Sequence, residues 1–175
     1  VHVSYEMTQL LSGRQYDGNT GGGADSESRT QGGKDLRTAI LFDPGESLVY
    51  VLGLEAEPAR VRLQLPKGWK PACSLKSAKG GGTFEAPSLA ALFDSPMLLG
   101  RIHRTDFKVK GVPFSLVFPE RPRVDAHTVA NGLKKIAEYQ FGLFGVKPFD
   151  RYVFLVMPQD DRRWLAGSDH GASSV

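Results

Sequence analysis

The hydrophobic pattern of this chain changes period once, and that change limits the folds it can adopt. Before Glu120 the apolar residues form short runs that turn residues such as Asp43-Pro44-Gly45 separate. In Ala59–Leu65 apolar and polar residues alternate, as in a strand with one buried and one solvated face. From Asp125 to Phe144 apolar residues instead recur at the spacing of an amphipathic helix. The sequence therefore predicts a mostly β chain with one long helix.

Local signals set the expected limits of these elements. Asp125 is the expected N-cap of the long helix. Gly145 is expected to end the helix in the left-handed conformation, and Pro148 prevents the helix from continuing. Ser88 is the expected N-cap of one short helical turn ending at Phe93. Strands are predicted at Val1–Leu11, Leu36–Phe42, Ser47–Leu54, Ala59–Leu65, Thr83–Ala86, Met97–Gly100, Arg101–Val109, Pro113–Phe118 and Arg151–Met157.

The order of these elements predicts two domains. Residues 1–120 would form an antiparallel β-sandwich-like domain, in which the Gly-rich stretch at 18–34 is a flexible loop. Residues 121–175 would form a linker, the helix and a strand that open a second, truncated α+β domain. A phosphate-binding loop at 18–34 is disfavoured, because the stretch lacks the Gly-Lys-Ser/Thr ending.

Composition excludes several classes of function. Lys and Arg total 22 against 19 Asp and Glu, so the net charge is only +3, and the basic residues are scattered; no nucleic-acid partner is expected. The single cysteine, Cys73, excludes an internal disulfide. No apolar stretch is long enough to cross a membrane, so we expect a soluble protein with no membrane partner, in a compartment that the sequence leaves open.

Only one segment combines several chemically useful side chains. Gly167-Ser168-Asp169-His170 follows the last predicted strand and brings a hydroxyl, a carboxylate and an imidazole side by side. This segment is either part of a functional site or a solvated polar tail after the last strand. The Asp94-Ser95-Pro96 turn is expected to hydrogen-bond its own backbone rather than to serve a site. The four histidines are too dispersed for a metal site, so neither a catalytic nor a metal-binding residue is predicted in this chain.

Several segments in order resemble the glycyl aminopeptidase family of metallopeptidases, from about Leu48 to the end of the chain. They are LPKGW (65–69), TFEA (83–86), LFDSPMLLG (92–100), FKVKGVPFSLVF (107–118), FGLFG (141–145), PFDRYVFLVM (148–157) and AGSDHGASS (166–174). The resemblance implies a β-sandwich-like N-terminal domain followed by a thermolysin-like zinc catalytic domain. This chain would hold the first domain and only the start of the second, with the zinc ligands downstream.

The resemblance also implies a role for the polar segment. Gly167 matches the second glycine and His170 the histidine of a Gly-Gly-Leu-Glu-His-type segment that lines the substrate cleft, where an acidic residue helps to hold the free amine. Ser168 stands in place of leucine and Asp169 in place of glutamate. The shorter Asp169 would move the carboxylate by about a bond length, which matters where positioning tolerances are about 0.5 Å.

Two functions from different classes follow. The first is the N-terminal region of a zinc-dependent aminopeptidase, which would be inactive alone, brace the catalytic domain and supply one wall of the peptide-substrate cleft. The alternative is a stand-alone β-sandwich module that binds protein or carbohydrate near Trp69 and Trp164. The first function predicts an uncovered apolar face on the helix Val129–Phe144, through which the fragment would also be able to dimerise.

Overall fold

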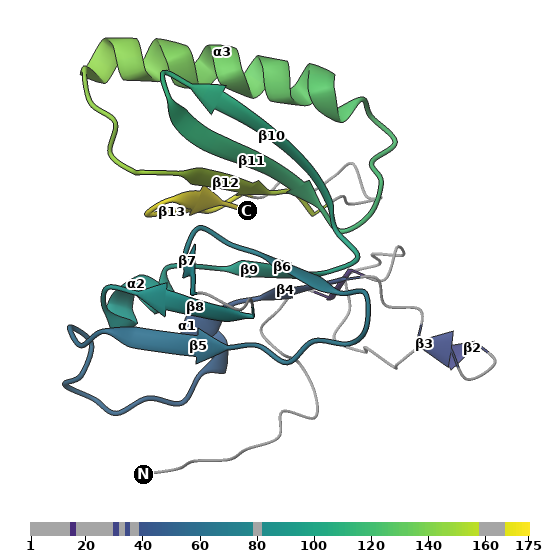
Figure 1. Cartoon of the computed structure of the whole chain (residues 1–175), viewed down its shortest axis with the longest axis vertical. Helices are drawn as coiled ribbons and strands as arrows, with labels where there is room; N and C mark the ends of the chain where they lie inside the picture. The colour runs from purple at the N-terminus through teal and green to yellow at the C-terminus, as the bar shows by residue number, and fades with distance from the viewer. Residues whose placement is uncertain (1–14, 17–29, 32–33, 36–38, 79–81, 158–166) are drawn as a thin grey trace.

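The computed structural model describes residues 15–16, 30–31, 34–35, 39–78, 82–157 and 167–175. In this part of the chain, three sheets are stacked and one long helix lies over the last of them (Figure 1). We call these the outer sheet (order β5-β8-β7), the central sheet (β1-β4-β9-β6) and the helix-covered sheet (β10-β11-β12-β14-β13). A separate two-stranded pair joins β2 and β3.

The described elements follow the chain in this order. They are β1 (Gln15–Tyr16), β2 (Thr30–Gln31), β3 (Lys34–Asp35), β4 (Ala39–Phe42), α1 (Pro44–Ser47), β5 (Ala59–Arg62), β6 (Lys70–Ala72), β7 (Lys76–Ser77), β8 (Thr83–Ala86), α2 (Leu89–Phe93), β9 (Met97–Gly100), β10 (His103–Val109), β11 (Val112–Phe118), α3 (Ala126–Phe144), β12 (Tyr152–Leu155), β13 (Asp169–His170) and β14 (Ser173–Ser174).

Strand β9 runs through the middle of the molecule and is buried on both faces. Met97 and Leu99 pack into a core shared with the outer sheet and α2. Leu98 points the other way, into a core shared with β11 and β12 of the helix-covered sheet. Because both faces are covered, the strand reads as a continuous apolar run rather than an alternating one. The central sheet therefore joins the two halves of the described structure.

The helix-covered sheet is built around β11. This strand pairs antiparallel with β10 and parallel with β12, and α3 makes the crossover between the parallel pair. Phe114 and Leu116 face α3, where they pack near Phe141 and Ala130 respectively. Val117 faces the central sheet. Strands β14 and β13 extend this sheet beyond β12.

The helix limits agree with the local signals. The Asp125 carboxylate accepts hydrogen bonds from the backbone N–H groups of His127 and Thr128, and Gly145 is left-handed with φ of 67°. Ser88 caps α2 by accepting from the N–H of Ala91. The predicted fold class is confirmed: the chain is mostly β, with one long helix followed by a strand.

The strand predicted at Ser47–Leu54 is wrong. Asp43 caps the N–H of Gly45, so the chain makes the short helix α1 at this point. It then continues as a loop in which Val51 and Leu52 are 67% and 79% exposed. An apolar, β-branched run matches the strand pattern, but within the described residues this one pairs with no strand of any sheet. The strand predicted at Val1–Leu11 and most of the Gly-rich stretch at 18–34 lie outside the described residues.

The predicted division into domains cuts across one sheet. Strands β10 and β11 precede residue 120, whereas β12, β13 and β14 follow it, and all five share the helix-covered sheet. The division at that residue stays a prediction, and a cut there would separate hydrogen-bonded strands β11 and β12.

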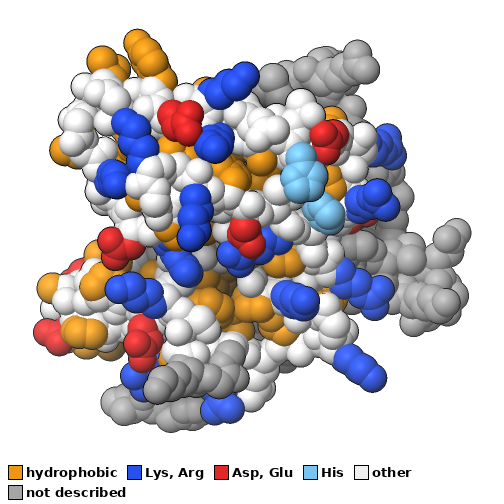
Figure 2. All heavy atoms as spheres, turned by 45° about the horizontal axis from the view of Figure 1, so that its top comes forward, with side chains coloured by type: hydrophobic (Ala, Val, Ile, Leu, Met, Phe, Trp, Pro, Cys, Tyr) orange, Lys and Arg blue, Asp and Glu red, His pale blue; other side chains and the backbone are white. Residues whose placement is uncertain are grey.

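Charged side chains of both signs lie on the face of the molecule that Figure 2 shows. In Figure 2, Lys and Arg side chains are distributed over the visible face with Asp and Glu between them. Within the described residues, no helix combines the length and the apolar character needed to cross a membrane.

The cap of α3 gives the first testable prediction. Hydrogen bonds from the Thr128 hydroxyl and then from the His127 N–H hold the pKa of Asp125 below its usual value of 3.8. A lowered folded-state pKa means that the cap stabilises fully above pH 3.8 and that its contribution is lost as pH falls through the folded-state value. Asp125→Ala should therefore lower Tm at pH 7, and this difference from the wild type should shrink in strong acid, where the protonated carboxyl keeps only an uncharged capping oxygen.

The matched control is Asp125→Asn, which keeps a capping oxygen without the titrating charge. Its Tm should lie near that of the wild type at neutral pH. Equal Tm values for Asp125→Ala and the wild type at pH 7, measured by circular dichroism, would contradict the prediction.

Candidate functional site

The polar segment at 167–170 forms a hairpin on the edge of the helix-covered sheet. Strand β13 pairs antiparallel with β14, which pairs parallel with β12. Ser168 and Val175 exchange both backbone hydrogen bonds, at 3.0 and 3.1 Å. Among the described residues, β13 is the last strand in the sheet order and pairs along one edge only. The predicted polar tail is thus part of a sheet and not a frayed end.

The hairpin divides the predicted site residues between its two faces. Ser168 and His170 are two positions apart on one strand, so their side chains share a face. Asp169 points to the opposite face, where it lies across from Ser174. Tyr152 is close to this pair: burial raises the pKa of Tyr152, with a hydrogen bond from Ser174 opposing that rise and the Asp169 carboxylate adding to it. The four predicted residues therefore do not form a single cluster.

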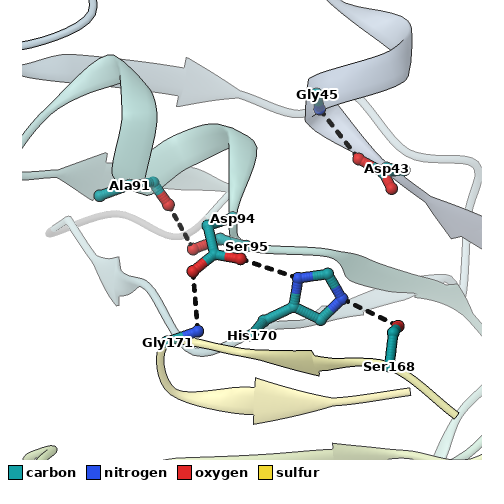
Figure 3. A network of polar contacts seen from close by, with 8 residues as sticks. All are labelled: Asp43, Gly45, Ala91, Asp94, Ser95, Ser168, His170 and Gly171. Carbon is teal, nitrogen blue, oxygen red and sulfur yellow. Dashed lines mark hydrogen bonds and ion pairs between the residues drawn. The ribbon is translucent and has the colours of Figure 1, made fainter.

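Asp94, in the turn after α2, contacts the hairpin of β13 and β14, which belongs to the helix-covered sheet (Figure 3). Its Oδ1 lies 2.9 Å from Nδ1 of His170. Its Oδ2 accepts the backbone N–H of Gly171 at 2.8 Å. The Nε2 atom of His170 lies in turn 3.1 Å from the hydroxyl of Ser168. A chain of hydrogen bonds thus joins Asp94, His170 and Ser168.

The expectation for the Asp94-Ser95 turn is half right. Ser95 does bond its own helix, with its hydroxyl donating to the carbonyl of Ala91 at 2.7 Å. Asp94 instead binds residues 76 and 77 positions away. The local sequence does not reveal such a partner. An Asp-Ser-Pro sequence is compatible both with a carboxylate that bonds its own turn and with one that bonds a distant segment.

Gly171 permits the close approach of Asp94. A Cβ atom at Gly171 would lie 3.1 Å from Oδ2 of Asp94, which is tighter than an ordinary contact. The glycine therefore lets the carboxylate reach the backbone N–H while it also holds the imidazole. Two hydrogen bonds to one carboxylate fix both the position of the hairpin and the orientation of the His170 ring.

A cleft of about 880 Å³ opens beside the turn of the hairpin. It is bounded on one side by the outer sheet and on the other by the segment 148–151, with Gly171 and Ala172 at its end. Arg60 and Glu85 form an exposed ion pair of 2.7 Å on its wall. Of the predicted site residues, none lines the cleft; the hairpin contributes only its turn.

Aromatic residues predicted as a binding patch are divided between the core and the part not described. Trp69 packs against the core of the outer and central sheets and is half-buried. Trp164 lies outside the described residues. Among the described residues, no group of three or more His, Cys, Asp or Glu side chains is placed to hold a metal ion.

Comparisons with known proteins place this geometry in context. Residues 24–101 match the Peptidase M61 N-terminal domain. A solved structure described as an aminopeptidase N family protein, from Idiomarina loihiensis, superposes with a TM-score of 0.71 and is 30% identical over 78% of this chain. This chain spans 24% of that structure's length. No curated protein matches. The chain thus contains a region like a peptidase-family N-terminal domain.

The M61-like region includes only part of the network. Asp94 lies within the matched residues, whereas Ser168, Asp169 and His170 follow them. The network is therefore formed between the matched region and the hairpin that comes after it.

Proposed function

We propose that this chain is the N-terminal part of a zinc-dependent aminopeptidase, in which it braces the catalytic domain and supplies one wall of the substrate cleft. The observation that carries the proposal is the match of residues 24–101 to the Peptidase M61 N-terminal domain. The likeness to a longer aminopeptidase N family protein supports it.

The outer face of α3 supports the bracing role. Ile136, Tyr139 and Leu143 are 56%, 72% and 64% exposed, and they recur at helical spacing along one side of the helix. Phe144 and Val146 continue the apolar surface, at 69% and 58% exposed. Such a run of exposed apolar side chains is typical of a contact surface. In the proposal, the remainder of the peptidase covers this face of α3, as expected for the N-terminal part of a longer enzyme.

Asp169 is the residue proposed to hold the substrate's amine. It is exposed on the edge strand β13, and its carboxylate is on the opposite face from the contact between His170 and Asp94. A fixed carboxylate binds a free ammonium group by charge-assisted hydrogen bonds, which gives an exopeptidase its preference for N-termini. The described residues do not fit a zinc site, so the metal ligands of the proposed enzyme lie elsewhere in it.

The test is Asp169→Asn in the natural protein that contains this chain, with amino acid 4-nitroanilides as substrates. Loss of a charged hydrogen bond costs about 1.5–3 kcal/mol, so KM should rise roughly tenfold to a hundredfold for substrates with a free amine. The control is Glu138→Gln, which removes an exposed carboxylate from the solvent side of α3. The amine-binding role is wrong if both variants have the KM of the wild type.

The peptidase assignment itself has a separate readout. The natural protein should contain zinc and lose hydrolysis of these substrates when a chelator removes the metal. A metal-free protein without that hydrolysis would favour the alternative, a β-sandwich binding module.

A further inference from the structure

We propose that Ser168, His170 and Asp94 act as nucleophile, general base and orienting carboxylate, and that Ser168 is acylated by activated carboxylic esters. This activity goes beyond the proposed peptidase function and does not depend on it. It uses the face of the hairpin on which His170 contacts Asp94. The proposed amine contact uses Asp169, on the other face.

The order of the hydrogen bonds carries the inference. Oδ1 of Asp94 lies 2.9 Å from Nδ1 of His170. A carboxylate only accepts, so this contact puts the ring proton on Nδ1 and leaves the Nε2 lone pair as the acceptor. The hydroxyl of Ser168 is 3.1 Å from that Nε2 atom (Figure 3), so with the imidazole in this neutral tautomer it is placed to donate to it. This is the arrangement in which an imidazole takes the proton of an attacking serine.

The strand pairing also supplies a donor for the negative charge that develops on the ester. Ser168 and Val175 form a hydrogen-bonded pair, so the next pair, Asp169 and Ser174, is a non-hydrogen-bonded one. The backbone N–H of Asp169 therefore points away from β14, towards the edge of β13 that pairs with no other described strand. An N–H from the residue that follows the nucleophile is a common oxyanion donor in serine hydrolases.

Access and burial set the size of the expected effect. Ser168 is exposed, and the side chains of His170 and Asp94 are 18% and 53% exposed. A reagent can reach the hydroxyl, but the carboxylate is partly solvated, which weakens its effect on the imidazole. We therefore expect the low end of general-base catalysis, about a hundredfold over an ordinary exposed serine.

In the proposed reaction, His170 accepts the proton of Ser168 and passes it to the leaving group. Oγ of Ser168 bonds to the acyl carbon while its proton moves to Nε2 of His170. The ester C–O bond then breaks, and the phenol or alcohol leaves with that proton. Water later cleaves the acyl–serine ester by the same route, which releases the carboxylic acid and restores the hydroxyl.

The experiment treats the whole chain with 4-nitrophenyl acetate, follows 4-nitrophenolate release, and maps the acetyl group by peptide mass spectrometry after an acid quench. The expected result is one acetyl group on Ser168. Ser168→Ala and His170→Gln should each lower the fast release by about a hundredfold. The control is Ser77→Ala, which removes an exposed hydroxyl on strand β7 and should change nothing.

Two results overturn the proposal. One is acetylation of lysines or of the N-terminus without any at Ser168 in the wild type, a result that needs no variant to fold. The other is unchanged release by Ser168→Ala, which would mean that a group other than Ser168 is the nucleophile. Asp94→Asn adds a test of orientation: it should slow acylation at least tenfold, with the fold checked by circular dichroism.

Discussion

Replacing Leu98 by alanine should lower the free energy of unfolding by about 2–5 kcal/mol. Leu98 is fully buried on β9 and packs between the central sheet and the helix-covered sheet. Its neighbours there include Leu41, Val117 and Leu155, which come from both sheets. Because these sheets cannot close around a smaller side chain without shifting one against the other, we expect a loss at the upper end of that range.

Urea unfolding followed by tryptophan fluorescence measures the effect. The control is Leu52→Ala, since Leu52 is 79% exposed in the loop after α1 and should change stability by less than about 0.5 kcal/mol. If Leu98→Ala were as stable as the control, the sheets would not share a packed core. The same variant should also disturb the contact between Asp94 and His170, because that contact crosses the interface that Leu98 fills.

Features fixed by neighbours in sequence were predictable, and features fixed by distant partners were not. Ser88, Asp125 and Gly145 were identified correctly because a cap acts on N–H or C=O groups within a few residues. The strands predicted at Arg101–Val109 and Pro113–Phe118 were found because alternation is a local signal, and they pair with each other as β10 and β11.

The loop at 48–54 was misread for the opposite reason. Its apolar residues satisfy a strand pattern, but a strand also needs a partner strand to pair with, and no local signal reports where that partner lies. The same limit applies to the site. Sequence order placed Gly167, Ser168, Asp169 and His170 together, whereas the pleat of β13 sends Asp169 to one face and its neighbours to the other.

The position of Asp94 connects the peptidase-like region to the site. Its turn follows α2, which packs in the core of the outer and central sheets, so the carboxylate is held by a rigid layer. Its two hydrogen bonds then hold the hairpin that carries Asp169 and Ser168. A region whose described residues form no cluster of three or more potential metal ligands can thus set the position of this hairpin.

Phe114→Ala should be the other strongly destabilising substitution, with a loss of about 3–5 kcal/mol. Phe114 is 2% exposed on β11. Its ring lies 5.3 to 6.1 Å from five other aromatic rings, those of Phe107, Phe141, Phe149, Tyr152 and Phe154. These rings come from β10, α3, β12 and the segment before β12, so one side chain supports every neighbour of the strand.

Its matched control is Tyr139→Ala, an aromatic truncation on the outer face of α3, where the side chain is 72% exposed. That variant should unfold within about 0.5 kcal/mol of the wild type in urea. Equal losses for the two variants would mean that α3 does not pack on β11 in solution. A large loss for Phe114→Ala alone would establish that the helix is held by its inner face, which leaves the outer face free for the domain proposed to cover it.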